Sequence, residues 1–365
     1  MVDAADGKGS DENADKGKDK APPRERSVTT QHEATIRGAR IPYSATAATL
    51  ILRDAEDEPQ ASIFHVSYLR GDVEDASSRP VTFAFNGGPG SSAMWLHLGC
   101  FGPRRLRMSD AVAPLPPPYS IVNNEHSLLD LSDLVFIDPV GTGYSRAHGK
   151  AKDKEFYEIK RDATSLAEFI QAWLTRHGRW SSPKFLAGES YGTTRAAAIT
   201  DELLQAGVVV NGSIMVSNAM HFGTLAFETG NDLPYVLYLP MNQYLGKELE
   251  YPETRRYEAI SLKVNESWSW ADDKRMGYPN TAEHLRRSML MNPHLKVFFA
   301  NGLYDLATPF FATEYTASHL GREEHIRANV YEATYPAGHM MYVHPPSMER
   351  LRDDLERFYR AAIPS

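Results

Sequence analysis

The chain has 365 residues, of which 42% are apolar and 24% are charged, a balance typical of a globular protein with a buried core. Its net charge of −8 argues against nucleic-acid binding, which requires a basic face, and no apolar run reaches the roughly eighteen residues that a membrane-spanning helix needs. Cys100 is the only cysteine, so an internal disulfide is excluded.

The first 26 residues carry charges of both signs together with Gly, Ser and Pro, and beyond Met1 their only large apolar side chain is Val2. Such a segment cannot bury enough surface to offset the entropy of ordering it, so residues 1–26 are predicted to be a disordered tether. They contain no recognisable secretory signal. The compartment is left open: cytoplasmic if the chain starts at Met1, periplasmic or secreted if a leader was removed.

Two extended runs come next in the chain. Ala48–Leu52 and Ser62–Leu69 are separated by the polar turn Asp54–Gln60, which predicts an antiparallel pair at the edge of a sheet. Further on, Asp162–Leu174 carries apolar residues at helical spacing until His177 and Gly178, which predict the end of a helix.

Short apolar runs then alternate with segments of helical period, and nothing repeats at a fixed interval. Buried strands separated by helices favour a mostly parallel sheet covered by helices on both faces, so an α/β fold is expected over residues 27–365. The expected strands are Val81–Phe85, Leu134–Ile137, Lys184–Ala187, Ser213–Val216, Lys296–Ala300 and Asn329–Ala333.

One stretch, from about His221 to Leu290, interrupts this rhythm. It mixes Tyr, Trp, Pro and charged residues, and contains one well-patterned helix, Ala282–Leu290. We interpret it as a cap inserted over the edge of the sheet where ligands bind.

Gly188–Gly192, with the sequence G-E-S-Y-G, follows a predicted strand and opens the predicted helix Thr193–Leu204. A serine in such a tight strand-to-helix turn is pushed out to where a base and a substrate can reach it, and the flanking glycines allow close packing. Ser190 is therefore the candidate nucleophile.

A serine nucleophile needs a histidine base and a carboxylate that orients the base. Asp305 lies just after the predicted strand Lys296–Ala300, and His339 lies after the next predicted strand. The chain order serine, aspartate, histidine is the one expected for a serine in a strand-to-helix turn of this kind. Four other histidines are expected to be surface or core residues: His65, His97, His221 and His344.

Asn86–Gly90, with the sequence N-G-G-P-G, directly follows the predicted strand Val81–Phe85. Glycines there let backbone N–H groups approach a substrate oxygen, so the amides of Gly88 and Tyr191 are the candidate donors to an oxyanion. A phosphate-binding loop is the alternative for a glycine run, but no Lys-Ser/Thr follows this one.

Four motifs in this order resemble the serine carboxypeptidase family, over roughly residues 79–345. They are Asn86–Gly90 with Ser91-Ser92, Asp138–Ser145, Gly188–Gly192 and Ala337–Met340. The resemblance implies the alpha/beta-hydrolase fold, with Ser190 as nucleophile, His339 as base, Asp305 as the residue that orients it, and the Gly88 and Tyr191 amides as the oxyanion hole.

The resemblance also implies a grip on the carboxylate of the substrate's last residue, made by Asn86, Gly87 and Glu189. An ionised Glu189 would repel that carboxylate, so Glu189 should be protonated there and donate a hydrogen bond. Activity as an exopeptidase at acidic pH is the expected consequence.

The chain departs from the family pattern at two positions. The family usually has a second glutamate where this chain has Cys100, and a tryptophan where it has Ala84. The cap, at about 70 residues between His221 and Leu290, is also shorter than is usual in the family.

Three functions remain open at this point. The first is a serine carboxypeptidase acting on peptide substrates through an acyl-enzyme on Ser190. The second is an esterase or acyltransferase that uses the same three residues, and the third is a non-catalytic binding protein on a hydrolase scaffold. No metal or organic cofactor is implied, because the chemistry requires only side chains and water. The oligomeric state is left open.

Overall fold

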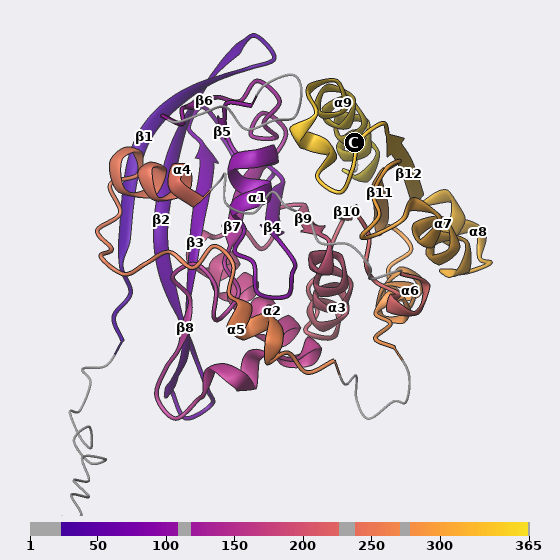
Figure 1. Ribbon diagram of the computed structural model, residues 1–365, viewed down its shortest axis with the longest axis horizontal. Coiled ribbons are helices and arrows are strands. Elements are labelled where there is room, and N and C mark those ends of the chain that lie inside the picture. Colours follow the sequence, from indigo (N-terminus) through magenta and orange to yellow (C-terminus); the bar gives the residue numbers. More distant parts are fainter. Residues whose placement is uncertain (1–22, 109–117, 226–237, 271–277, 364–365) are drawn as a thin grey trace, which may run out of the picture.

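A computed structural model describes residues 23–108, 118–225, 238–270 and 278–363 of the chain. Its centre is one sheet, in which the strands follow the order β1-β2-β3-β7-β4-β9-β10-β11-β12 and β8 pairs with β3 (Figure 1). The strands are β1 Ser27–Ile36, β2 Ala39–Arg53, β3 Pro59–Arg70, β4 Val81–Phe85, β7 Asp133–Ile137, β8 Arg146–Ala147, β9 Lys184–Glu189, β10 Gly212–Val216, β11 Lys296–Gly302 and β12 Val330–Tyr335. A separate small ladder joins β5 Arg104–Leu106 to β6 Ile121–Asn123.

The sheet is parallel from β7 to β12 and antiparallel at the other edge, where β1, β2 and β3 run as a meander that joins β7. The parallel part matches the expectation from the alternating strands and helices. Because parallel strands align their carboxyl ends, the loops after β4, β9 and β11 come together at one edge of the sheet.

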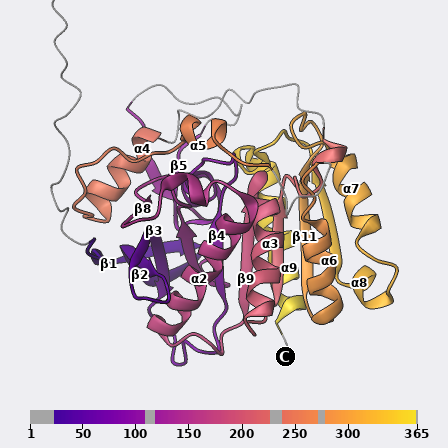
Figure 2. The same ribbon diagram turned by 90° about the horizontal axis from the view of Figure 1, so that it is seen from below.

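Helices cover both faces of this sheet, as Figure 2 shows. The described helices are α1 Met94–Leu96, α2 Ile159–His177, α3 Tyr191–Gln205, α4 Tyr238–Gln243, α5 Leu262–Glu266, α6 Ala282–Met291, α7 Phe310–His319, α8 Glu324–Ala328 and α9 Pro345–Ala362. The single turns of other helical geometry are η1 His97–Phe101, η2 Asp153–Phe156, η3 Phe222–Thr224, η4 Tyr244–Glu248 and η5 Met341–Val343.

Two apolar cores result, one on each face. On one face the Trp173 ring of α2 packs edge-on against Phe83 of β4, with ring centroids 5.4 Å apart. On the other, Tyr359 of α9 packs against Phe185 of β9 at 4.3 Å. Successive residues of a strand point to opposite faces, so each central strand contributes to both cores and is buried throughout.

The antiparallel edge is larger than the sequence predicts. Strand β2 begins at Ala39 rather than near Ala48, and a third strand, β1, pairs along its outer side. In β1 only Ala34 and Ile36 are buried, because the strand lies at the sheet edge and turns a row of polar side chains to solvent. An edge strand of this composition carries little of the apolar signal by which strands are recognised.

The stretch interpreted as a cap has several roles in the structure. Its last helix, α6, packs beside α3, where His284 and Arg287 both bind the Asp201 carboxylate. Its middle part reaches the opposite face, where the Tyr244 hydroxyl lies 2.7 Å from that of Tyr68 on β3. The cap boundaries of 221 and 290 remain a prediction, and part of this stretch lies outside the described residues.

The predicted tether, residues 1–26, lies mostly outside the described residues as well. Its last two residues contact the sheet and α2: the Arg26 amide donates to Thr49 Oγ1 over 2.9 Å, and Glu25 forms an ion pair with Arg176. Across the described part of the chain, none of the helices combines the length and the apolar character needed to cross a bilayer.

Candidate active site

Ser190 occupies a strained turn between β9 and α3. Its φ of +56° lies in a region that residues other than glycine rarely adopt. Two backbone hydrogen bonds hold the turn, from the Ser190 amide to Val216 O and from the Thr193 amide to Ser190 O, each 2.9 Å long. A side chain at Gly188 would collide with the backbone of Gly192, so this glycine is required by the closeness of the turn. The strand-to-helix turn predicted from the sequence is therefore present.

His339 and Asp305 are brought together by the loops after β12 and β11. His339 Nδ1 lies 2.7 Å from Asp305 Oδ2. The Asp305 side chain has no exposed surface and that of His339 is 11% exposed, so the pair is screened from water on most sides. The structure thus places the predicted acid next to the predicted base.

Thr308 is a third partner of this pair that the sequence analysis missed. Its hydroxyl donates to Asp305 Oδ2 over 2.6 Å and lies 3.2 Å from His339 Nδ1, while its amide donates to Asp305 Oδ1 over 2.9 Å. The spacing D-x-x-T ahead of Pro309 and helix α7 is a local signal that could have revealed it, because Asp and Thr side chains often bond the backbone of such turns.

The pKa values of the pair move in opposite directions. Burial alone would raise the pKa of Asp305, but the hydrogen bonds from His339 and Thr308 outweigh it and hold this pKa below its ordinary value. Burial alone would lower the pKa of His339, but its hydrogen bond with Asp305 and the charges of Asp305 and Glu189 raise it. Each partner therefore favours the charged form of the other.

The glycine loop after β4 lies against the start of α3. A Cβ atom at Gly87 would collide with the amide nitrogen of Tyr191, and Gly88 has a φ of +105°. Only glycines allow the two backbone segments to come this close. The two predicted oxyanion donors, the amides of Gly88 and Tyr191, thus belong to adjacent segments.

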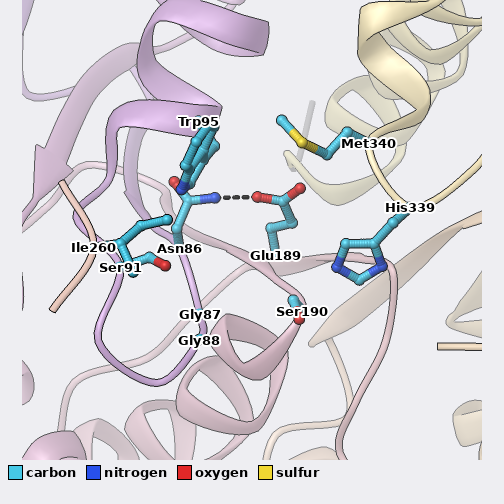
Figure 3. A pocket seen from close by; sticks show the side chains of 10 residues that line it. All are labelled: Asn86, Gly87, Gly88, Ser91, Trp95, Glu189, Ser190, Ile260, His339 and Met340. Atoms are coloured by element: carbon cyan, nitrogen blue, oxygen red, sulfur yellow. Dashed lines mark hydrogen bonds between the residues drawn. The ribbon is translucent and has the colours of Figure 1, made fainter. Parts of the chain in front are cut away.

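These elements enclose a cavity of about 240 Å³. Figure 3 shows Ser190 below Glu189 and His339 to one side of both. Two apolar side chains to which the sequence assigned no role, Trp95 and Met340, also face this cavity. The lining residues are Asn86, Gly87, Gly88, Ser91, Trp95, Glu189, Ser190, Ile260, His339 and Met340.

Glu189 is buried in the wall of the cavity, and both of its oxygens accept a hydrogen bond. Asn86 Nδ2 donates to Oε2, as Figure 3 shows, and the Tyr342 hydroxyl donates to Oε1 over 2.6 Å. The Asn86 amide cannot be reversed, because its Oδ1 accepts from the Leu96 amide over 3.1 Å. Burial raises the pKa of Glu189, and the charge of His339 and these two hydrogen bonds partly offset it.

A strand-like segment of the cap stretch closes one side of the cavity. Ile260 faces the cavity, and its neighbours bond the glycine loop: the Ser261 amide donates to Gly90 O and the Ser92 amide to Ala259 O. These contacts join residues that are far apart in the sequence, so no local sequence pattern predicts them.

The second of the four motifs, Asp138–Ser145, is hydrogen-bonded to the cap stretch close to this segment. The Asp138 carboxylate accepts from the Ala93 amide over 2.9 Å and from the Tyr257 hydroxyl over 3.1 Å through its Oδ1. Burial raises the pKa of Asp138 to about 7. Asp138 therefore joins the helix after the glycine loop to the cap stretch and has no position in the cavity wall.

The histidines predicted to be bystanders lie outside the cavity. His65 packs against Phe169 and is fully buried, and burial lowers its pKa to about 3. His97 stacks on Phe136 in the core of the other face. His344 bonds Ser347 at the start of α9, and His221 lines a different cavity beside α6 and α7.

Residues 53–220 match the model of the family described as serine carboxypeptidase. This segment includes the glycine loop, the second motif and the Ser190 turn, and the same family was suggested by the four motifs. Over these residues the chain is similar to the serine carboxypeptidase family.

Two curated relatives show how far the similarity extends. The chain is 33% identical to serine carboxypeptidase-like 5 and 34% identical to serine carboxypeptidase-like 1, both of Arabidopsis thaliana, over 152 residues in each case. Each alignment covers 40% of this chain and 32% of the relative. The chain thus spans about a third of the length of these relatives.

Solved structures extend the likeness to most of the chain. A prohormone-processing carboxypeptidase from Saccharomyces cerevisiae superposes with a TM-score of 0.65 at 15% identity, covering 87% of this chain and 91% of that one. An esterase from Pyrococcus furiosus superposes with a TM-score of 0.50 at 12% identity, covering 87% and 92%. At such identities the likeness concerns the fold, and it confirms the predicted alpha/beta-hydrolase fold.

The two departures from the family pattern are both buried. Ala84 lies within β4 and Cys100 within η1, and neither side chain is exposed. Burial raises the pKa of Cys100, and the nearby charge of Glu189 raises it further, so this thiol is uncharged. Burial and the charge of Glu189 likewise raise the pKa of the Tyr342 phenol. Cys100 and Tyr342 are thus neutral groups near Glu189.

Proposed function

We propose that this chain is a serine hydrolase in which Ser190 attacks the carbonyl carbon of an acyl bond and forms an acyl-enzyme. The observation that carries the proposal is the juxtaposition, in one cavity, of the strained Ser190 turn and a histidine already oriented by a buried carboxylate. The similarity of residues 53–220 to the serine carboxypeptidase family supports the same reaction class.

The hydrogen bond to Asp305 assigns the proton of His339. Because the ionised Asp305 can only accept, Nδ1 of His339 carries the hydrogen and Nε2 keeps a lone pair. Nε2 can then take the proton of the Ser190 hydroxyl as its oxygen attacks, and return it to the leaving group. A water molecule, activated by the same nitrogen, hydrolyses the acyl-enzyme.

We assign the stabilisation of the negative charge that develops on the carbonyl oxygen to the amides of Gly88 and Tyr191. Donors fixed in advance by the backbone stabilise such charge without reorganising during the reaction. The closeness of the glycine loop to the start of α3 supports this assignment.

For the substrate we propose a peptide with a free C-terminal carboxylate, so that the protein acts as a serine-type carboxypeptidase. Asn86, Gly87 and Glu189 face the cavity beside Ser190, where they could hold that carboxylate. Burial raises the pKa of Glu189, which favours the neutral form needed beside an anionic substrate. Activity on such peptides is expected to be greatest at mildly acidic pH.

A second candidate is hydrolysis or transfer of an ester's acyl group. Two observations favour it. Both oxygens of Glu189 already accept hydrogen bonds, from Asn86 and Tyr342, and Cys100 stands where the family pattern has a second acid. Such a site holds a substrate carboxylate less strongly than a pair of acids that share a proton.

Two measurements test these proposals. Labelling with a fluorophosphonate should modify Ser190, and absence of label would leave only a non-catalytic binding protein on this scaffold. Release of free amino acids from a series of peptides, each offered as the acid and as the amide, separates the carboxypeptidase from the esterase. A series that releases none, with p-nitrophenyl esters cleaved, favours the second candidate.

A further inference from the structure

Arg195 is a fully buried arginine that no step of the proposed reaction uses. It lies on α3, five residues after Ser190, and only 1% of its surface is exposed. Its Nε donates to Asp162 Oδ2 of α2 over 2.7 Å, and one of its terminal nitrogens donates to the backbone carbonyl of Asn86. Its guanidinium carbon lies 5.1 Å from the centre of the Tyr191 ring.

Besides Asp162 and the Phe85 ring of β4, whose centre lies 5.9 Å from the guanidinium carbon, the partners given above belong to the machinery that is assigned to the oxyanion. Asn86 opens the glycine loop, two residues before Gly88, and Tyr191 carries the second amide. Asp162 in turn holds the guanidinium from the neighbouring helix. One side chain therefore joins the two segments whose amides must point at a single oxygen atom.

The pair is not explained by stability alone. Removing a guanidinium and a carboxylate from water is costly, and apolar side chains of similar size often stabilise a core as well or better. What a guanidinium adds is a planar fork that donates in two fixed directions at once. Here the two directions are the Asp162 carboxylate and the Asn86 carbonyl.

We propose that Arg195, held by Asp162, is a positioning residue that fixes the distance between the Gly88 and Tyr191 amides. The bond to the Asn86 carbonyl sets the orientation of the glycine loop, and the contact with the Tyr191 ring sets the first turn of α3. This inference rests on the proposed function, since it assigns a role within the same oxyanion hole.

A second buried pair in the same protein supplies a matched control. Arg179 donates to Asp133 Oδ2 over 2.6 Å and to the backbone carbonyls of Arg79 and Pro80, and both partners of the pair are buried. Asp133 is the first residue of β7, so this pair lies at the amino ends of the parallel strands, at the edge opposite to the cavity. A loss of activity or of Tm that follows from disturbing any buried ion pair should appear in variants of both pairs.

The experiment compares Arg195→Lys with Arg179→Lys, since lysine keeps the charge and loses the fork. The readouts are kcat and KM for a p-nitrophenyl ester, the affinity of an alkyl trifluoromethyl ketone, and Tm. The ketone forms a hemiketal with the serine whose oxygen occupies the oxyanion hole. For Arg195→Lys we expect kcat to fall roughly 10- to 100-fold with KM within twofold, and ketone affinity to fall by a similar factor. Arg179→Lys should lower Tm and leave kcat within twofold.

Asp162→Asn is the second test of the same idea, and it carries the test if Arg195→Lys does not fold. Asparagine keeps the shape of Asp162 and removes its charge, which weakens the bond to Arg195. The values of kcat and ketone affinity should therefore again fall together. Equal loss of kcat in Arg195→Lys and Arg179→Lys, or unchanged ketone affinity in folded Arg195→Lys and Asp162→Asn, would overturn the inference. Failure of the proposed function looks different: the unaltered protein would neither cleave the ester nor be labelled at Ser190, and the inference would fall with it.

Discussion

The hydroxyl of Tyr342 donates a 2.6 Å hydrogen bond to Oε1 of Glu189, across 153 residues of chain. The bond favours the ionised form of Glu189, because a phenol donor stabilises the negative charge it faces. It therefore opposes burial, the larger influence, which raises the pKa of Glu189. The balance between the two decides at which pH this side chain can accept an anionic substrate beside it.

Tyr342→Phe should shift the pH profile of carboxypeptidase activity. Without the phenol the pKa of Glu189 rises further, so its neutral form persists to higher pH. We expect kcat/KM for a free-acid peptide to decline at a higher pH than in the unaltered protein, whereas the profile for the matching amide stays unchanged. Measurement of both substrates between pH 4 and 8 checks this; an equal change for acid and amide would mean that Tyr342 acts only on packing.

Cys100→Glu should restore a second acid beside Glu189. Two adjacent carboxyls cannot both ionise cheaply, so one proton would be retained to higher pH. The preference for free-acid over amidated peptides should rise about 10- to 100-fold, which is the worth of one hydrogen bond to a charged group. Cys100→Gln is the control for added bulk in this buried position. If the acid-to-amide ratio and the pH profile are the same in both variants, position 100 does not reach the substrate's carboxylate.

Ser190→Ala should abolish turnover and leave the fold intact. Loss of the nucleophile costs several orders of magnitude in kcat, and the oxyanion donors sustain whatever remains. His339→Ala should be similarly severe, and Asp305→Asn somewhat less so. The measurements are kcat and Tm for each variant. More than a few per cent of activity in a Ser190→Ala protein with unchanged Tm would contradict the assignment.

Thr308→Val should weaken the acid–base pair without removing any of its members. The hydroxyl of Thr308 donates to the same Asp305 oxygen that faces His339, and its loss removes one of the interactions that keep the pKa of Asp305 low. We expect kcat to fall roughly tenfold at unchanged KM, as for a lost hydrogen bond to a charged group. Thr308→Ser keeps the hydroxyl and should retain most of the activity. Equal losses in the two variants would assign the effect to packing around position 308 and not to the hydroxyl.

Two truncations should separate the effect of residues 1–22 from the effect of the contacts that Glu25 and Arg26 make with the domain. Deleting residues 1–22 should change neither Tm nor activity. Deleting residues 1–26 also removes the Glu25–Arg176 ion pair and the bond between Arg26 and Thr49, so Tm should fall by a few degrees with kcat unchanged. A large loss of Tm on removing residues 1–22 would show that they pack on the domain.

The sequence alone was sufficient for features that depend on a few neighbouring residues. The strands around Ser190 are short apolar runs bounded by turn residues, and helix α2 ends where Gly178 takes a φ of +64°. The chain order of Ser190, Asp305 and His339 follows from where the strands end, and the structure brings Asp305 and His339 to hydrogen-bond distance. Local signals fail where the local pattern is polar, as in the edge strand β1.

The tertiary structure decided which distant side chains support those residues. Tyr342 reaches Glu189 across 153 residues, and Arg195 reaches the Asn86 carbonyl across 109. Neither partner lies in a recognisable motif with the other, because a hydrogen bond between elements depends on how helices pack on the sheet and leaves no periodic trace in the chain. The sequence thus determined the proposed reacting groups, and the packing of α3, η5 and the glycine loop determined the charge and the position in which they are held.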